Sequence, residues 1–185
     1  MTAPSTGRLV AQLGLVVAAL AAVGALAGVV WQWVWTPTIG VVADHRWTAG
    51  DAIGLQHEFS GTGWYVVVGT LAGLIAGVVI ALLVNRKPLL TLAAVVVGSV
   101  LGAWLMLVVG TSLGPPDQDD VARTADDGTP VPIALTVSGH SPFIALPAGA
   151  LLGLCVVFVG LSPRTRPEPQ PDTLPEEPAD AAAAG

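Results

Sequence analysis

Four long runs of apolar residues, each free of charged side chains, dominate the hydrophobic pattern of this chain. They cover residues 9–35, 64–84, 89–113 and 142–161. About 20 helical residues cross the hydrocarbon core of a bilayer. A helix satisfies its own backbone hydrogen bonds inside lipid, whereas a β-barrel would need an apolar and polar alternation that is absent here. The pattern predicts an all-α membrane protein with four transmembrane helices.

The segments around these runs give the expected organisation of the chain. We expect a cytoplasmic N-terminus at 1–8 and a four-helix transmembrane domain at 9–161. Two extracytoplasmic loops occupy 36–63 and 114–141, and a tail follows at 162–185. The tail is rich in Pro, Glu and Ala and cannot bury enough apolar surface to offset ordering. It is predicted to be a disordered cytoplasmic tail.

Composition supports a membrane protein and argues against one class of partner, nucleic acids. The chain is 53% hydrophobic and 11% charged, whereas soluble domains carry about 25% charged residues. The net charge of −6 comes without the basic patch of a nucleic-acid-binding protein, so no nucleic acid is expected as a partner. Cys155 is the single cysteine; it excludes an intramolecular disulfide and is expected to behave as a small hydrophobic residue.

The basic residues predict the direction of the spans. Most of them flank the runs at what would be one side of the bilayer, namely Arg8, Arg86, Lys87, Arg164 and Arg166. The positive-inside rule places these residues in the cytoplasm. The prediction is a multi-pass plasma-membrane protein with both termini cytoplasmic and both long loops outside.

Aromatic residues gather at the predicted outer ends of the first two spans. Trp31, Trp33 and Trp35 close the first run, and Trp64 with Tyr65 opens the second. Tryptophan and tyrosine are enriched at membrane–water interfaces. We therefore expect these five residues to form an interfacial belt rather than a ligand cage.

The first run also has features of a secretory signal peptide. Ala25 and Ala27 form an A-x-A pattern after an apolar stretch. The apolar stretch continues to Trp35, beyond the 7–15 residues or so of a signal hydrophobic region. A retained helix is favoured, and cleavage would leave three spans.

Pairs of glycines four residues apart recur in every span. Small residues let helices approach closely in a membrane, where the hydrophobic effect does not drive their association. The expected helix-packing residues are Gly24, Gly28, Gly69, Gly73, Gly77, Gly98, Gly102, Gly149 and Gly153. The pattern leaves open whether these strips meet within one chain or between chains of a homo-oligomer.

The glycine pattern also indicates an internal repeat. "VGALAGVVW" (23–31) resembles "VGSVLGAWL" (97–105), and "AGLIAG" (72–77) resembles "AGALLG" (148–153). The two spans in each comparison run in the same direction across the membrane. The chain is thus predicted to contain two tandem helical hairpins, an arrangement found in transporters with parallel repeats.

The outer loops hold the candidate metal ligands. His45, His57 and Glu58 lie in the first loop and His140 in the second, and these residue types bind metals such as zinc. Their spacing matches no metal motif, so a solvated loop is favoured, with residues 52–59 folded back onto the membrane surface.

The second loop is acidic and contains a candidate strand. Its five aspartates lack the spacing of an EF-hand, which favours a hydrated turn over a calcium site. The β-branched residues in 132–137 favour a short strand. Pairing of this strand with residues 40–43 would make a small outer cap.

No motif for catalysis or cofactor binding occurs in the sequence. The predicted spans contain no Asp, Glu, Lys, Arg or His, which counts against a proton-coupled transporter. Their polar residues are expected to bond to neighbouring helices, and these are Gln12, Gln32, Thr70, Thr91, Ser99 and Thr111. No Walker A, G-x-S-x-G, H-E-x-x-H or C-x-x-C motif is present. We expect no enzyme activity and no cofactor.

Three sequence stretches carry a family resemblance. They are "WVWTP" at the end of the first span, "EFSGTGWYVVVGTLAGLIAG" entering the second, and "VVVGSVLGAW" in the third. Over about residues 9–161 the chain resembles the uncharacterised actinobacterial four-helix membrane proteins grouped as a domain of unknown function, as in mycobacteria. The resemblance implies a four-helix fold and implies no activity.

Three hypotheses for function follow. The leading one is a non-enzymatic accessory or scaffold protein in envelope biology, in contact with the lipid bilayer and a membrane-protein partner. The alternative is a small transporter or channel subunit acting as a homo-oligomer. The third is an outer-loop sensor or metal-binding protein that uses His45, His57, Glu58 and His140.

Overall fold

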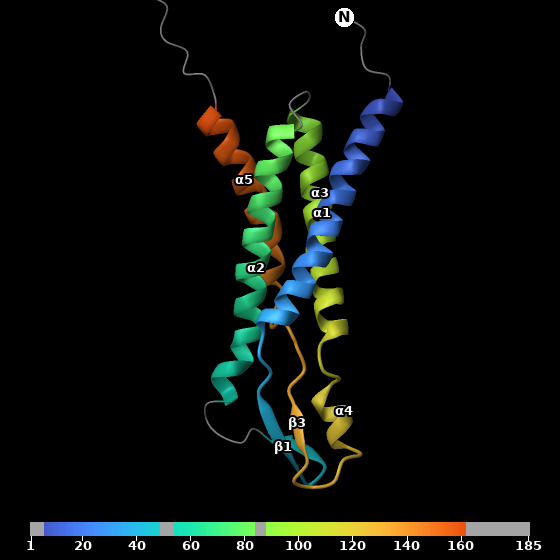
Figure 1. Cartoon of the computed structure of the whole chain (residues 1–185), viewed down its shortest axis with the longest axis vertical. Helices are drawn as coiled ribbons and strands as arrows, with labels where there is room; N and C mark the ends of the chain where they lie inside the picture. The colour runs from blue at the N-terminus through green and yellow to red at the C-terminus, as the bar shows by residue number, and fades with distance from the viewer. Residues whose placement is uncertain (1–5, 49–53, 84–87, 162–185) are drawn as a thin grey trace, which may run out of the picture.

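The computed structural model describes residues 6–48, 54–83 and 88–161 (Figure 1). Four long helices form a bundle, and they are α1 (Thr6–Val34), α2 (Gly54–Leu83), α3 (Pro88–Leu113) and α5 (Ala145–Leu161). All four are long and apolar enough to cross a membrane. The prediction of four transmembrane helices is confirmed. The predicted tail at 162–185 lies outside the described residues.

The second helix begins earlier than the hydrophobic pattern predicts. Residues 54–63, expected to belong to the outer loop, form the first turns of α2. Gly61 lies in these turns against other parts of the chain, since an added Cβ there would lie 3.1 Å from the carbonyl oxygen of Thr136. Packing at Gly61 thus stabilises the end of a helical segment whose polar composition predicts a loop.

The closest packing joins helices that are not neighbours in sequence. α1 packs chiefly against α3, and α2 packs chiefly against α5. We call these two parallel pairs the first leaf (α1 with α3) and the second leaf (α2 with α5). The closest contacts therefore join corresponding helices of the two predicted hairpins, rather than the two helices of one hairpin.

Glycines bring the backbones together in the first leaf. Gly24 lies directly against the backbone of Gly102. An added Cβ at Gly28 would lie 2.6 Å from the carbonyl oxygen of Met106, and one at Gly98 would lie 2.9 Å from Leu20 Cδ1. A side chain at these positions would therefore force the two helices apart.

Contacts in the second leaf follow the sequence repeat, so that residues 76 positions apart make equivalent contacts. Gly73 faces Leu146 and Ala150, whereas Gly149, its counterpart 76 residues later, faces Thr70 and Leu74. These last two are in turn the counterparts of Leu146 and Ala150. The first leaf departs from this rule. Gly24 meets Gly102, so its counterpart Gly98, 74 residues later, should meet Gly28, but Gly98 faces Val17 and Leu20 instead.

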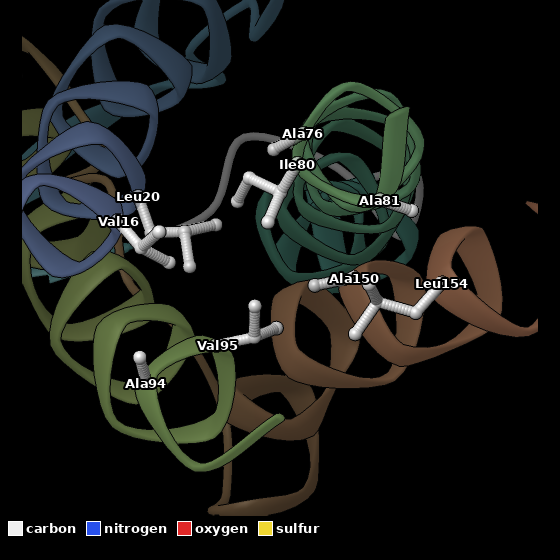
Figure 2. Packing of buried hydrophobic residues seen from close by; sticks show 9 residues of the cluster. All are labelled: Val16, Leu20, Ala76, Ile80, Ala81, Ala94, Val95, Ala150 and Leu154. Carbon is white, nitrogen blue, oxygen red and sulfur yellow. The ribbon is translucent and has the colours of Figure 1, made fainter. Parts of the chain in front are cut away.

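The two leaves meet in an apolar core. Figure 2 shows Val16 and Leu20 of α1 and Val95 of α3 directed toward Ile80 of α2, with Ala150 of α5 beside them. The residues of this cluster are all small or aliphatic. Two polar residues of α3, Thr91 and Ser99, are also buried.

Two polar residues of α3 bond within their own helix. Ser99 Oγ donates to the carbonyl oxygen of Val96 at 3.1 Å, and Thr111 Oγ1 donates to that of Leu107 at 2.8 Å. Both were expected from the sequence to bond to a neighbouring helix. Ser and Thr hydroxyls readily reach carbonyls three or four residues back, which satisfies them locally.

A small cap covers one end of the bundle (Figure 1). It contains the strands β1 (Ile39–Ala43), β2 (Arg46–Thr48) and β3 (Pro130–Pro132) and the short helix α4 (Gln118–Ala122). The strands form an antiparallel sheet in the order β2-β1-β3. The described ends of the chain, at Thr6 and Leu161, lie at the opposite end of the bundle, which we call the far end (Figure 1).

The cap matches the predicted pairing between the two loops, with a shifted strand. β3 covers residues 130–132, whereas 132–137 were expected, and it pairs with β1 through Gly40↔Val131. Beyond β3 the chain turns into the bundle, where Leu135 is buried among the aromatic residues. Burial of Leu135 thus ends the strand where its β-branched composition predicts a continuation.

Candidate functional site

A buried aromatic cluster joins the two leaves at the cap end of the bundle. The Trp31 side chain of α1 is fully buried, and its Nε1 donates to the carbonyl oxygen of Gly61 in α2 at 2.8 Å. The Trp31 and Tyr65 rings meet edge to face, with centroids 5.1 Å apart and planes at 83°. Edge-to-face pairs are a favourable aromatic geometry. Trp31 therefore connects α1 of the first leaf to α2 of the second leaf.

Tyr65 makes a second connection between the leaves. It lies fully buried on α2, and its hydroxyl donates to the carbonyl oxygen of Ala103 in α3 at 2.8 Å. Its ring also contacts Phe143 with centroids 5.8 Å apart. Phe143 belongs to η1 (Ser141–Ile144), the short 3-10 helix that leads into α5. All four long helices thus converge on this cluster.

Only two of the five residues expected to form an interfacial belt are exposed. Trp33 is 82% exposed and Trp64 is 42% exposed. Trp31, Trp35 and Tyr65 are instead buried in the bundle core. These three are packing residues, because their position around the helix axis turns them toward other helices rather than toward lipid.

The β1–β2 connection of the cap is a strained two-residue turn. Asp44 and His45 have positive φ angles of 51° and 57°, and they separate the paired residues Ala43 and Arg46. Two positive φ angles are the pattern of a type I′ hairpin turn, which matches the twist of the strands. Asp and His tolerate this region better than most residues.

An open hollow of about 550 Å³ lies on the surface of the cap. Its lining residues come from both outer loops and are Asp44, His45, Arg46, Trp47, Asp119 and Arg123. Two carboxylates and two guanidinium groups thus face the same space. Arg123 also pairs with the Asp120 carboxylate at 2.9 Å across the helix surface. Arg46 and Arg123 lie 77 positions apart in the chain, so no sequence motif indicates that they meet.

The candidate metal ligands are spread over the structure. His45 lies at the tip of the β1–β2 hairpin, and His140 lies beside η1 at the bundle. His57 and Glu58 lie in the first turns of α2, and their side chains fall outside the described residues. Among the residues that the structure describes, no three His, Cys, Asp or Glu side chains gather in a geometry that could hold a metal ion.

The remaining predicted residues have the following places. Arg8 lies in the first turns of α1 at the far end, whereas Arg86, Lys87, Arg164 and Arg166 lie outside the described residues. Gly69 lies near Met106 Sδ, and Gly77 and Gly153 lie against α5 and α2 respectively. Cys155 is exposed on α5.

Four apolar helices with exposed aliphatic surfaces define a multi-pass integral membrane protein. Side chains such as Val10, Leu83 and Val159 are more than half exposed, as lipid contact requires. No family model, no curated protein and no solved structure matches the chain.

Substituting Gly40 is expected to disrupt the cap alone. The Trp47 indole lies across Gly40, where an added Cβ would be 2.6 Å from the carbonyl oxygen of Thr48, and Trp47 Nε1 donates to the carbonyl oxygen of Val131 at 3.0 Å. Gly40→Val should displace this ring at a cost of about 1–3 kcal/mol to the cap. Hydrogen exchange should show faster exchange in β1–β3 and unchanged protection in the four long helices.

Ala43→Val is the matched control for this substitution. Ala43 is an exposed residue of the same strand, and valine suits a strand. We expect native protection in this variant. Equal exchange rates in Gly40→Val and Ala43→Val would contradict the proposed role of the Trp47–Gly40 contact.

Proposed function

We propose that this chain is a non-enzymatic accessory or scaffold protein of the plasma membrane that acts in envelope biology. Its termini lie in the cytoplasm, and the cap lies outside, where it contacts a partner protein. The relationship to actinobacterial four-helix membrane proteins is part of the same proposal.

The packing of the bundle centre carries this proposal. Between the leaves lie aliphatic, small and aromatic side chains, and the buried polar residues in the described part of the chain are Thr91 and Ser99. Routes for ions or protons place ionisable groups inside the membrane. A packed apolar centre beneath a folded polar cap favours a protein that presents a surface over one that conducts a solute.

Cross-linking in native membranes followed by mass spectrometry tests the proposal. The full-length chain should co-purify with a stoichiometric partner protein. The double variant Arg46→Ala/Arg123→Ala changes only the hollow on the cap surface. It should recover less of that partner, while its helical content stays native. Recovery of the chain with copies of itself alone would overturn the accessory role.

Thiol labelling tests the proposed orientation. In a Cys155→Ser background, Thr124→Cys places a thiol on the exposed cap surface, and Gly7→Cys places one at the far end, where an added Cβ meets no other atom. A membrane-impermeant maleimide should label Thr124→Cys on intact cells and label Gly7→Cys only after permeabilisation. The reverse pattern would place the cap in the cytoplasm.

The symmetry of the second leaf favours a second candidate, a small transporter or channel subunit. Gly73 and Gly149 make equivalent contacts, and parallel repeats are known in transporters. This role predicts a defined homo-oligomer and solute flux in liposomes. A monomer without flux would remove it.

A further inference from the structure

Each leaf is held together by close contacts between helix backbones. In the first leaf, Gly24 and Gly102 touch through their backbones. In the second leaf, Gly73 and Gly77 lie against the backbones of Leu146 and Ala150. Contact between backbones leaves no side chain to rearrange, so each pair of helices should move as one body.

Two hydrogen bonds join the leaves at the cap end. The bonds from Trp31 to Gly61 and from Tyr65 to Ala103 both cross from one leaf to the other. The segment between β3 and η1 is held to α2 at the same end, because Ser138 N donates to Thr62 Oγ1 at 3.0 Å. The cap end therefore resists separation of the leaves.

The far turns of α1 and α5 are less buried than the rest of these helices, although Leu13 and Val157 still contact the core between the leaves. The far turns of α1, residues 7–15, contain no buried residue, and neither do residues 155–160 of α5. Figure 1 shows α1 and α5 diverging there, while the ends of α2 and α3 lie side by side. Only four residues separate Leu83 of α2 from Pro88 of α3, which limits how far those two ends can separate.

We infer that the bundle is a hinge, in which the two leaves rock about the fixed cap end so that the far ends of α1 and α5 move apart and together. The short α2–α3 connection keeps one edge of the far end closed, so the opening occurs between α1 and α5. This is a rigid-body motion of packed helices. It does not depend on the accessory function proposed above.

Distances between paired spin labels test the hinge in the full-length protein in lipid nanodiscs. In a Cys155→Ser background, cysteines at Val10 and Val159 report on the far ends of the two leaves. Cysteines at Val10 and Leu92 report within the first leaf, and cysteines at Val30 and Ile144 report on the cap end. All of these native side chains are exposed, so the labels should be tolerated.

The Val10/Val159 distance distribution should be at least about twice as broad as the other two, as expected for domain-scale rocking. Tyr65→Phe, which removes one connection at the cap end, should broaden the Val30/Ile144 distribution. The hinge is overturned if Val10/Val159 is no broader than Val10/Leu92. A broad Val10/Leu92 distribution would also overturn it, because α1 would then move independently of α3.

Discussion

Replacing Gly73 by leucine is expected to destabilise the folded bundle strongly. An added Cβ at Gly73 would lie 2.9 Å from the backbone nitrogen of Ala150 and even closer to the Leu146 carbonyl oxygen. Backbone atoms cannot rotate away, so the α2–α5 contact must separate along its length. We expect a loss of more than about 3 kcal/mol, measured as a lower midpoint of thermal unfolding in detergent. Gly77→Leu should behave in the same way, because Gly77 faces the backbone of Ala150.

Gly63→Leu is the matched control on the same helix. An added Cβ at Gly63 meets no atom within 4 Å, and leucine has a higher helix propensity than glycine by somewhat less than about 1 kcal/mol. This variant should unfold at or above the wild-type midpoint. Wild-type stability in Gly73→Leu would show that the α2–α5 contact does not hold the bundle together.

Truncating Trp31 should have the second largest effect on stability. Trp31→Ala removes a fully buried ring, its hydrogen bond to Gly61 and its contact with Tyr65. It also leaves a cavity beside Gly110, whose added Cβ would lie 2.7 Å from Trp31 Cζ3. Truncation of a buried Trp costs about 3–5 kcal/mol. Denaturant unfolding monitored by circular dichroism would measure this loss.

Trp33→Ala provides a control two residues away. Trp33 is 82% exposed, so its removal should change the free energy of unfolding by less than about 1 kcal/mol. If the two variants lose the same stability, then the assignment of Trp31 to the core and of Trp33 to the surface is wrong.

The hydrophobic pattern alone predicts the number and approximate position of the membrane-spanning helices. A charge-free run of some 20 residues must be helical in lipid, because its backbone groups find no other hydrogen-bond partners. For the same reason α3 (Pro88–Leu113) matches its predicted span of 89–113 almost residue for residue. The β-branched residues and the loop positions also predicted that the two outer loops would pair into a cap.

Which face of each helix is buried depends instead on how the helices pack in three dimensions. Trp31 and Trp33 lie about 200° apart around the helix, yet both have apolar surroundings, because lipid and a protein interior are equally apolar. A membrane helix therefore carries no amphipathic signal that separates core from surface. The same ambiguity hid the pairing of α1 with α3, since every span contains glycines with the same spacing. The cap hollow likewise depends on the fold, because Arg46 and Arg123 meet only once the strands of both loops have paired.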